Sequence, residues 1–501
     1  MSAINVGIIG LGRIADVHYP GYRNNKRARI YAVCDINEEL AVARKKTWKA
    51  VKHYTDYREM LQDPSLDAVE ILSPHTLHEP MVLDTAASGK HIALQKPMTV
   101  SLESADRMIR AADAGKNIFR VTDNYAFYPP IVLAKKIIES GDIGDPVNLR
   151  IKLIGGGSGG WNIPPESWQW RLRESRERGN TLGLETFDHG HHLWTTAWYL
   201  MGEAERVSAW IEFMDGIIDA PAVVTWRFKK GYFGSTEFVH LPDLHIPSKY
   251  YANDEWIEVS GTKGMILVRR CTGLILDGPP VSVFTNRGWK HYTGVKSDWG
   301  EGFRIATGNF INAILGVEKP LLSGPEARDI LKFSLAVQKS AHLRREVYLD
   351  EMDASFPALT RFRKRRHDMK TEDTGRSLLE RLGLSADLSR YAPQARSLTE
   401  EFIGKFNKAA AAGWKASIGL HIIAEGGAAD TSYSLLINDG ELTVKEGETP
   451  VSPSLLIHVP AGTWAAILLG KRKIEMAYLQ GKLKIEGKAE EALKLRSAFG
   501  I

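Results

Sequence analysis

A glycine-rich turn near the N-terminus constrains this chain more than any other feature of its sequence. The run INVGIIGLGRIA is strand-like and then places Gly10, Gly12 and Ala15 in the pattern G-x-G-x-x-A, where a helix-compatible stretch begins. Gly10 permits a tight turn, Gly12 lets the backbone approach a pyrophosphate, and Ala15 allows close helix packing. The pattern therefore predicts a βαβ unit that binds a dinucleotide.

An acidic residue adds weight to this motif and indicates the cofactor. Asp35 ends the second strand-like run, RIYAVCD, and lies 20 residues beyond Ala15. A carboxylate at this place can accept hydrogen bonds from the adenosine ribose, and its charge repels a 2′-phosphate. Ile36 and Asn37 supply no compensating cation, so NAD is favoured over NADP. The alternative interpretation is a glycine turn in an unrelated α/β fold.

Strand-like and helical runs continue to alternate after this unit, as in AVEILSP, HIALQKP and SLESADRMIRAADAG. This alternation is typical of a doubly wound parallel sheet, so residues 1–123 are predicted to form an α/β Rossmann domain. An α+β substrate domain with a large open sheet is expected over residues 124–353. The charged, weakly periodic residues 354–396 suit a linker, and a third, α+β domain would fill residues 397–501.

Composition and charge narrow the classes of protein to which the chain can belong. Charged residues make up 25% of the chain, and no apolar run is long enough to cross a bilayer, so we expect a cytoplasmic protein without a membrane span. Cys34 and Cys271 are too few for a disulfide framework. Much of the basic excess behind the net charge of +5 lies in residues 361–370. A charged run of this kind favours a solvated linker over a binding site for a polyanion, so we expect no nucleic-acid partner.

The stretch TFDHGHHLW at residues 186–194 is the second feature that indicates chemistry. Asp188 and His192 are four residues apart, so they would share one face of a helix and could act on the same substrate. Asp188, His191 and His192 also fall within about 100° of arc, which leaves a metal site as an alternative. No H-E-x-x-H motif is present, and we favour a proton relay without metal, with His189 and His191 packing or lining the pocket.

The distribution of these motifs resembles the Gfo/Idh/MocA family of oxidoreductases over roughly residues 1–350. SPHTLH at 73–78 is similar to the family's loop around the nicotinamide. GKHIALQKP at 89–97 is similar to its Gly-Lys-His…Glu-Lys-Pro segment, with Gln95 in place of the glutamate. TFDHGHH matches its D-x-x-x-H motif, whereas Thr195 stands where the family commonly has a further aspartate.

The resemblance implies hydride transfer from a secondary alcohol to NAD and assigns three catalytic residues. His192 would be the general base, Lys96 would orient the hydroxyl group and stabilise the developing alkoxide, and Asp188 would orient the base or the substrate. The expected cofactor contacts come from Gly10, Gly12, Arg13, Ile14, Asp35, Ser73, His75, His78, Gln95, Lys96 and Arg171.

Tryptophans gather in the segment that follows the glycine-rich loop GGGSGG. Trp161, Trp168 and Trp170 lie close together there, and such rings can stack on the apolar side of a sugar or on an aromatic group. Core packing is the alternative for each of them. The pair Trp170-Arg171 also resembles a Trp-Arg pair of the family. The expected substrate contacts come from Trp161, Trp170, Asp188, His191 and His192.

Residues 397–501 resemble the sterol carrier protein domain. The order of SLTEEFIGKFNKAAAAGW, SYSLLINDGELTVKEG and TWAAILLGKRKIEMAYLQGKLKIEG is similar to that family, in which sheet and helices enclose an apolar tunnel for lipids or acyl chains. The resemblance therefore implies a lipid or apolar ligand. A packing or dimerisation module without a ligand is the alternative.

We therefore expect an NAD-dependent dehydrogenase that oxidises a ring hydroxyl of a sugar, glycoside or cyclic polyol and works as a homo-oligomer. A redox-neutral epimerase or glycosidase that retains its NAD would use the same residues. A non-catalytic NAD-gated sensor or lipid-binding protein is the alternative from another class.

Overall fold

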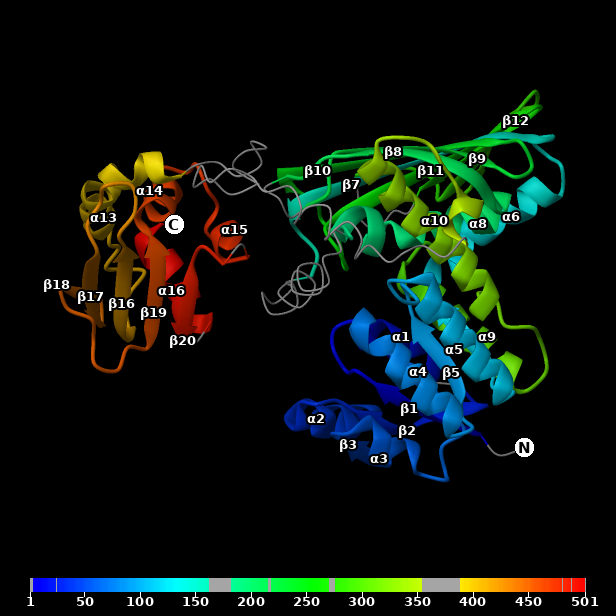
Figure 1. The fold of residues 1–501 in the computed structure, drawn as a ribbon, viewed down its shortest axis with the longest axis horizontal. Coiled ribbons are helices and arrows are strands. Elements are labelled where there is room, and N and C mark those ends of the chain that lie inside the picture. The colour runs from blue at the N-terminus through cyan, green and yellow to red at the C-terminus, as the bar shows by residue number, and fades with distance from the viewer. Residues whose placement is uncertain are drawn as a thin grey trace. The chain divides into compact units, whose positions relative to one another are not determined.

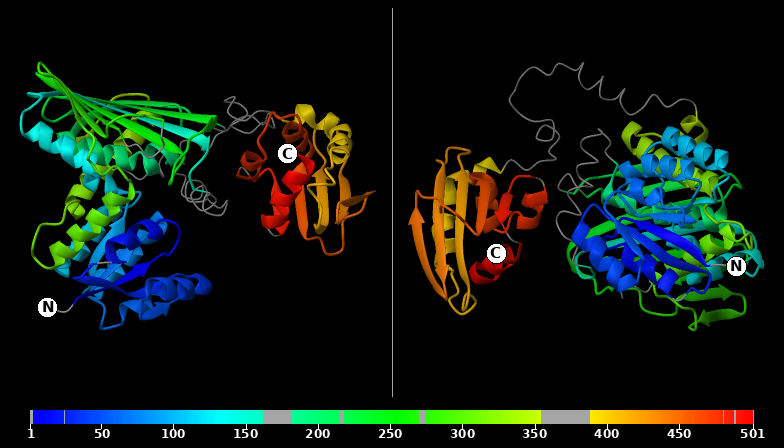
Figure 2. Two further views of the ribbon diagram at one scale, coloured as in Figure 1. Left: turned by 180° about the vertical axis from the view of Figure 1, so that it is seen from behind. Right: turned by 90° about the horizontal axis from the view of Figure 1, so that it is seen from below.

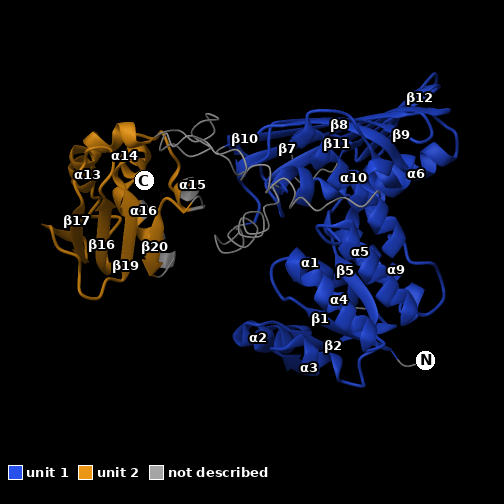
Figure 3. Ribbon diagram, viewed as in Figure 1, with its two compact units in different colours: residues 1–163, 170–214, 218–369 blue, residues 164–169, 215–217, 370–501 orange. Residues whose placement is uncertain are grey.

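The computed structural model describes residues 3–23, 25–161, 182–214, 218–269, 275–353, 388–479, 481–487 and 489–500. These residues divide into two compact units (Figure 3), one ending at residue 353 and the other beginning at residue 388. Trp168, Trp170, Arg171 and Cys271, and most of the predicted linker, lie outside the described residues.

The first unit begins with a six-stranded parallel sheet. Its strand order is β3-β2-β1-β4-β5-β6 (Figure 1), which confirms the doubly wound Rossmann arrangement. The order reverses between β1 and β4, so a crevice opens at the carboxyl ends of these two strands. The strands are β1 (Ile4–Ile9), β2 (Ala28–Cys34), β3 (Lys52–Tyr54), β4 (Ala68–Ile71), β5 (His91–Gln95) and β6 (Phe119–Thr122).

Helices connect these strands and cover the sheet, because the strands are apolar on both faces and must be buried on both. Side chains cap three of the helices: Asn37 accepts from the Leu40 amide before α2, Asp56 from the Arg58 amide before α3, and Ser101 from the Ser104 amide before α5. The helices are α1 (Ala15–Arg23), α2 (Glu38–Trp48), α3 (Tyr57–Leu61), α4 (His78–Ala87) and α5 (Leu102–Ala114).

A nine-stranded sheet follows, with the order β14-β13-β12-β11-β7-β10-β9-β8-β15. It is the large open sheet predicted from the sequence, and only β7 and β10 pair in parallel among its described pairs. The strands are β7 (Pro146–Ser158), β8 (Ala204–Ile211), β9 (Ala222–Phe228), β10 (Phe233–His245), β11 (Asn253–Gly261), β12 (Gly264–Arg269), β13 (Val281–Thr285), β14 (Gly288–Tyr292) and β15 (Val347–Tyr348).

The described residues between 124 and 353 contain four α-helices, and Figures 1 and 2 show α8 and α10 on one face of this sheet. Trp194 of α8 is fully buried and packs edge-on or tilted against Trp226, Phe238 and Phe333. An apolar contact of this size fixes α8 on the sheet. The helices are α6 (Pro129–Glu139), α8 (His191–Met201), α9 (Gly300–Ile314) and α10 (Gly324–Leu343).

The two sheets of the first unit are joined through helices α1 and α9. A Cβ atom on Gly21 of α1 would lie 2.4 Å from the hydroxyl oxygen of Thr307 on α9, so only glycine allows this close approach. Phe310 and Ile311 of α9 belong to the apolar cluster that includes Val6 of β1. The later part of this unit therefore completes the core of the earlier part, and the predicted boundary at residue 123 divides two parts that pack as one unit.

The second unit has its own core. A five-stranded sheet of order β18-β17-β16-β19-β20 carries its helices on one face (Figure 2). Trp464, Phe402 and Phe499 form the centre of a separate apolar cluster. The elements are η5 (Ser389–Gln394), α13 (Ala395–Gly404), β16 (Lys415–Ile423), β17 (Thr431–Asn438), β18 (Glu441–Glu446), β19 (Leu455–Pro460), α14 (Ala461–Leu468), α15 (Ile474–Leu479), β20 (Lys484–Gly487) and α16 (Ala489–Phe499). Among the described residues, no helix has the length and apolar content needed to cross a bilayer.

Because this core is separate, we expect residues 388–501 to fold when produced alone. Thermal unfolding followed by circular dichroism should show one cooperative transition. Trp464→Ala should destabilise this segment by about 3–5 kcal/mol, because it empties the centre of the core. The same substitution in the full chain should leave the transition of residues 1–353 unchanged. Aggregation of the isolated segment, or a shift of both transitions, would show that the cores depend on each other.

Candidate active site

The glycine-rich turn lies at the crevice between β1 and β4. Gly10 has a φ of +86°, and a Cβ atom there would lie 2.8 Å from the Leu72 carbonyl oxygen. Both facts require glycine. A Cβ atom on Gly12 would meet no atom within 4 Å, so the backbone at the N-terminus of α1 is open to a ligand. Amide groups at a helix N-terminus favour an anionic group such as a pyrophosphate.

Asp35 is held beside this turn. Its carboxylate accepts hydrogen bonds from the Leu11 amide at 2.8 Å and from the Asn37 amide at 3.0 Å. These two bonds leave acceptor positions on both oxygens, since a carboxylate has about four lone-pair sites. The neighbouring Ile36 is 95% exposed and carries no charge. The geometry therefore fits a ribose with free hydroxyl groups better than one that carries a 2′-phosphate.

Residues predicted to surround the nicotinamide follow β4 and β5. The hydroxyl group of Ser73 is buried and has no hydrogen-bond partner among the described residues, as expected of a group that meets a ligand. His78 is fully buried, and its ring nitrogens face the carbonyl oxygens of Ser73, Pro97 and Met98 at 2.9–3.1 Å. The ring therefore bridges the two loops, and we no longer assign His78 a direct contact with the cofactor.

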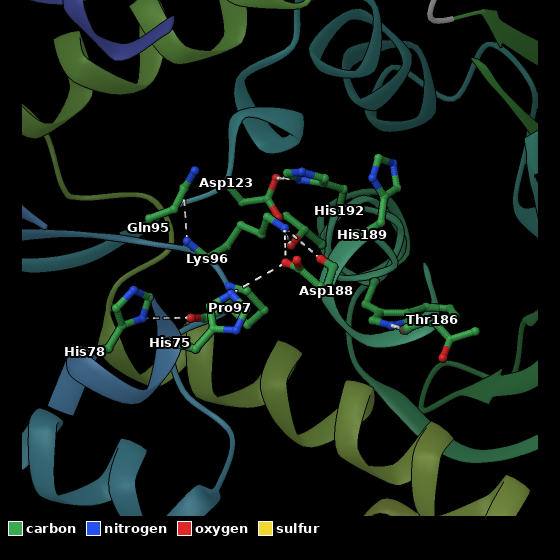
Figure 4. Close-up of polar contacts among 12 residues, drawn as sticks. His75, His78, Gln95, Lys96, Pro97, Asp123, Thr186, Asp188, His189 and His192 are labelled. Carbon is green, nitrogen blue, oxygen red and sulfur yellow. Dashed lines mark hydrogen bonds and ion pairs between the residues drawn. The ribbon is translucent and has the colours of Figure 1, made fainter. Parts of the chain in front are cut away.

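Lys96 and Asp188 form the first ion pair of the site (Figure 4). The Lys96 ammonium group donates to Oδ1 of Asp188 at 2.8 Å and to its carbonyl oxygen at 2.7 Å. Nε2 of His75 lies 3.6 Å from the same Oδ1. The neighbouring Gln95 accepts from the Lys96 amide with its side-chain oxygen at 3.1 Å. A lysine from the first sheet is thus tied to the segment that carries the histidines.

That segment is a π-helical turn, Leu184–His189, followed by α8. Asp219 holds the turn, because its buried carboxylate accepts from the Glu185 and Thr186 amides at 2.7 Å. Asp188 therefore lies on a different helical turn from His192, and the simple four-residue spacing of one α-helix does not apply. Both side chains nevertheless reach the same polar cluster (Figure 4).

His192 forms the second polar pair of the site, with Asp123. Its Nδ1 lies 2.8 Å from one oxygen of the Asp123 carboxylate, and the Thr195 hydroxyl donates to the other oxygen at 2.8 Å. The ring of Tyr125 stacks on His192 with 4.4 Å between centroids and 17° between planes. Both carboxylate oxygens and one face of the imidazole are therefore fixed.

Burial decides the charge state of this imidazole. It lowers the pKa of His192 to about 4, although the Asp123 carboxylate opposes the change. Burial alone would raise the pKa of Asp123, but the imidazole and the Thr195 hydroxyl hold it well below its usual range. Near neutral pH the ring is uncharged. If Nδ1 carries the hydrogen and donates it to Asp123, Nε2 becomes the acceptor.

Asp123 is the residue that the sequence reasoning missed. We predicted that Asp188 orients either the base or the substrate, and in the structure Asp188 binds Lys96 whereas Asp123 binds His192. The signal was present, because Asp123 directly follows β6 at the carboxyl edge of the sheet. Thr195, which replaces the family aspartate, contacts the same carboxylate. The negative charge beside His192 therefore comes from Asp123, which follows β6, and not from α8.

The remaining predicted residues lie around this cluster or outside it. His191 is 1% exposed, and burial lowers its pKa to about 3, so it is enclosed rather than presented to a substrate. Ile14 packs partly against the core. Trp161 is half-buried among Tyr250, Tyr251 and Trp299. Among the described residues, no three histidine, cysteine or acidic side chains are arranged to hold a metal.

A cavity of about 350 Å³ opens beside α1 and the start of α9. It brings Arg13 and Trp161, predicted for cofactor and substrate, to one wall, where the guanidinium lies 5.8 Å from the ring centroid. The lining residues are Arg13, Asp16, Val17, Pro20, Trp161, Tyr250, Asp298, Gly300, Glu301 and Arg304.

Comparison with known families agrees with this arrangement. Residues 4–123 match the oxidoreductase family with the NAD-binding Rossmann fold, and residues 131–267 match the GFO/IDH/MocA C-terminal domain. Residues 400–500 match the SCP-2 sterol transfer family.

Among curated proteins, the chain is 28% identical over 364 residues to a myo-inositol 2-dehydrogenase of Thermotoga maritima, which covers 70% of this chain and 99% of that protein. It is also 28% identical over 301 residues to a levoglucosan dehydrogenase of Pseudarthrobacter phenanthrenivorans, over 53% of this chain and 74% of that one.

Among solved structures, a probable dehydrogenase from Thermotoga maritima superimposes with a TM-score of 0.57 at 26% identity, over 70% of this chain and all of that chain. A levoglucosan dehydrogenase in complex with NADH and levoglucosan shares the fold, with a TM-score of 0.59 at 22% identity over the same shares. The cofactor of this chain is NAD, as the Rossmann family match and the Asp35 geometry indicate.

The position of Asp35 predicts how strongly NAD is preferred. Asp35→Asn should weaken NAD binding by about tenfold, because a charge-assisted hydrogen bond to the ribose becomes a neutral one. NADP binding should improve relative to NAD, since the repulsion of the 2′-phosphate is lost. Calorimetric titration with both cofactors measures the ratio. Glu38→Gln removes an exposed charge nearby and should leave that ratio unchanged, and equal binding of NAD and NADP by the unaltered chain would contradict the assignment.

Proposed function

Because residues 4–267 of this chain belong to the Gfo/Idh/MocA family of oxidoreductases, we propose that the protein is an NAD-dependent dehydrogenase that oxidises a ring hydroxyl group. Residues 400–500 match the SCP-2 sterol transfer family. The substrate class is a sugar, glycoside or cyclic polyol. The observation that carries the proposal is the convergence of Lys96–Asp188 and His192–Asp123 at the carboxyl edge of the Rossmann sheet.

The chain's own residues bind and orient the cofactor. The open backbone at Gly12 would receive the pyrophosphate, the Asp35 carboxylate would accept the ribose hydroxyl groups, and Ser73 would contact the nicotinamide side. When bound, NAD supplies the acceptor for the hydride that leaves the substrate carbon.

His192 accepts the hydroxyl proton. Its neutral form at physiological pH leaves Nε2 available, while Asp123 and the stacked Tyr125 ring hold the imidazole in one orientation. When the proton arrives, the Asp123 carboxylate stabilises the imidazolium that forms, as a buried carboxylate does for a catalytic histidine. Thr195 keeps that carboxylate in place.

Lys96 stabilises the oxygen from which the proton leaves. The Lys96 side chain is 11% exposed, and its ammonium group is held by the side chain and the carbonyl oxygen of Asp188. A fixed cation in a site with little water lowers the energy of the developing alkoxide. Asp188 therefore positions the lysine and, through the exposed part of its carboxylate, can also accept a substrate hydroxyl group.

The dehydrogenases named above act on inositol and levoglucosan, which are ring compounds with several hydroxyl groups, and this supports the substrate class. For the second unit we infer an apolar ligand, supported by its SCP-2 family match. Titration of residues 388–501 with a fluorescent fatty acid tests that inference. We also infer a cytoplasmic homo-oligomer, in keeping with an NAD enzyme that has two cysteines.

A screen of the purified chain with NAD against sugars, glycosides, polyols and aromatic dihydrodiols, followed by NADH absorbance, tests the function. His192→Ala should lower turnover of the best substrate by about two to four orders of magnitude, because the hydroxyl proton loses its acceptor. NAD affinity, measured by calorimetry, should persist. Stoichiometric zinc, with loss of activity on chelation and recovery on adding zinc, would instead indicate a metal site.

The pH dependence follows from the lowered pKa of His192. The base works when neutral, and its pKa of about 4 lies below the ordinary histidine value. We therefore expect kcat/KM to stay level as pH falls from about 8 to about 5.5, with no acidic limb near the usual histidine pKa of about 6.5. Asp123→Asn removes a charge that raises this pKa, so any acidic limb should move further down while kcat/KM falls. A limb near 6.5 would contradict the assignment of His192.

A further inference from the structure

A second imidazole paired with a buried carboxylate lies beside His192. His189 ends the π-helical turn, and its Nε2 atom lies 3.2 Å from Oε1 of Glu255 on β11. The side-chain amide of Asn253 lies 3.0 Å from the same nitrogen. The Glu255 side chain is 1% exposed, whereas that of His189 is 14% exposed. The carboxylate is therefore enclosed, and the imidazole reaches the accessible part of the site.

Tyr125 connects this pair with the first one. Its hydroxyl group donates to the two oxygens of Glu255, at 2.8 and 2.7 Å, and its ring is the one that stacks on His192. The ring centroids of His189 and His192 are 5.5 Å apart, and their planes meet at 80°. Figure 4 shows both rings on the same side of the cluster. Two imidazoles, each with a buried carboxylate behind it, thus stand next to each other.

Oxidation of a hydroxyl group needs only one of these pairs, because a single proton leaves the substrate oxygen. The ketone that forms offers a second proton. A C–H bond on the carbon next to the carbonyl is acidified, since the electrons left behind delocalise onto oxygen, and abstraction of such a proton is a common enzymatic step. His192 and His189 have ring centroids 5.5 Å apart. One imidazole can therefore approach a hydroxyl group while the other approaches the neighbouring C–H group of the same sugar or polyol ring.

On the basis of the dehydrogenase function above, we propose that His189, backed by Glu255, removes the proton from the carbon next to the new carbonyl group. The enzyme then enolises its keto product. The C–H bond breaks, its electron pair forms the C=C bond of the enolate, and the carbonyl π pair moves to the oxygen beside the Lys96 ammonium group. The proton moves to Nδ1 of His189, because Nε2 lies 3.2 Å from Glu255 whereas Nδ1 has only a long contact of 3.5 Å with the Asn253 side-chain amide.

Return of the proton from His189 to the same carbon restores the ketone, and exchange of that proton with solvent leaves a label at this carbon. No further oxidant is needed, since the oxidation that creates the ketone precedes this step. The ligand class is therefore a ring compound that carries a C–H group next to the oxidised carbon. A site of this kind would also serve an enzyme that retains NADH and reduces the ketone again.

The test runs the full-length enzyme in D2O with NAD and the compound that reduces NAD fastest in the screen above. Mass spectrometry and NMR then measure deuterium at the carbon next to the carbonyl group, both in the ketone and in the recovered alcohol. We expect incorporation at least tenfold faster than in the ketone without enzyme. NADH formation without such incorporation overturns the enolisation and leaves the dehydrogenase intact. Absence of NADH, in single-turnover as well as steady-state measurements, means that the dehydrogenase proposal itself has failed.

Variants separate the two bases. His189→Gln should lower deuterium exchange by about 100-fold more than it lowers NADH formation, because a base of this kind contributes about two to four orders of magnitude. Glu255→Gln should lower the same ratio, with near-native NAD binding showing that the fold survives. His291→Asn changes a histidine on β14, outside the cluster, and should alter neither rate. An equal loss of exchange and NADH formation in His189→Gln would show that His189 only shapes the site and would overturn the proposal.

Discussion

Two polar side-chain pairs connect distant parts of the chain within the first unit. Lys96 follows β5 and binds Asp188, and Asp123 follows β6 and binds His192. In each pair one residue belongs to the Rossmann sheet and the other to the segment around the π-helical turn and α8. The Asp123 carboxylate is 1% exposed, so loss of the His192 ring would leave this buried group without one of its hydrogen-bond partners. The groups proposed to carry out the chemistry therefore also connect the Rossmann sheet with the segment around α8.

Burial gives these pairs their chemical character. The same enclosure that strengthens the contact between Asp123 and His192 lowers the pKa of the imidazole and so keeps a histidine neutral next to a carboxylate. Nearby, burial raises the pKa of Glu185 to about 7, with Asp219, Asp188 and Glu255 adding to the effect and His189 opposing it. Burial therefore separates the pKa values of neighbouring acidic and basic groups in this part of the structure.

The second unit follows a different principle. Its apolar cluster around Trp464 is formed by described residues between 392 and 499, and residues 400–500 match the SCP-2 sterol transfer family. Because this core is separate, the apolar ligand proposed for it can be tested with residues 388–501 alone.

The sequence by itself determined the parts of the protein that depend on neighbouring residues. Gly10, Gly12 and Asp35 predicted the Rossmann turn and NAD, since turn geometry, helix N-terminus and strand end all lie within one βαβ unit. Lys96 and His192 could be named from short motifs. The carboxylates that pair with the histidines could not be named in this way, because Asp123 lies 69 residues from His192 and Glu255 lies 66 residues from His189. Such pairs form only when separate sheets pack together, because local spacing carries no information about which carboxylate is buried beside which imidazole. For this reason the tertiary structure alone decided that Asp188 binds Lys96 and that Asp123 binds His192.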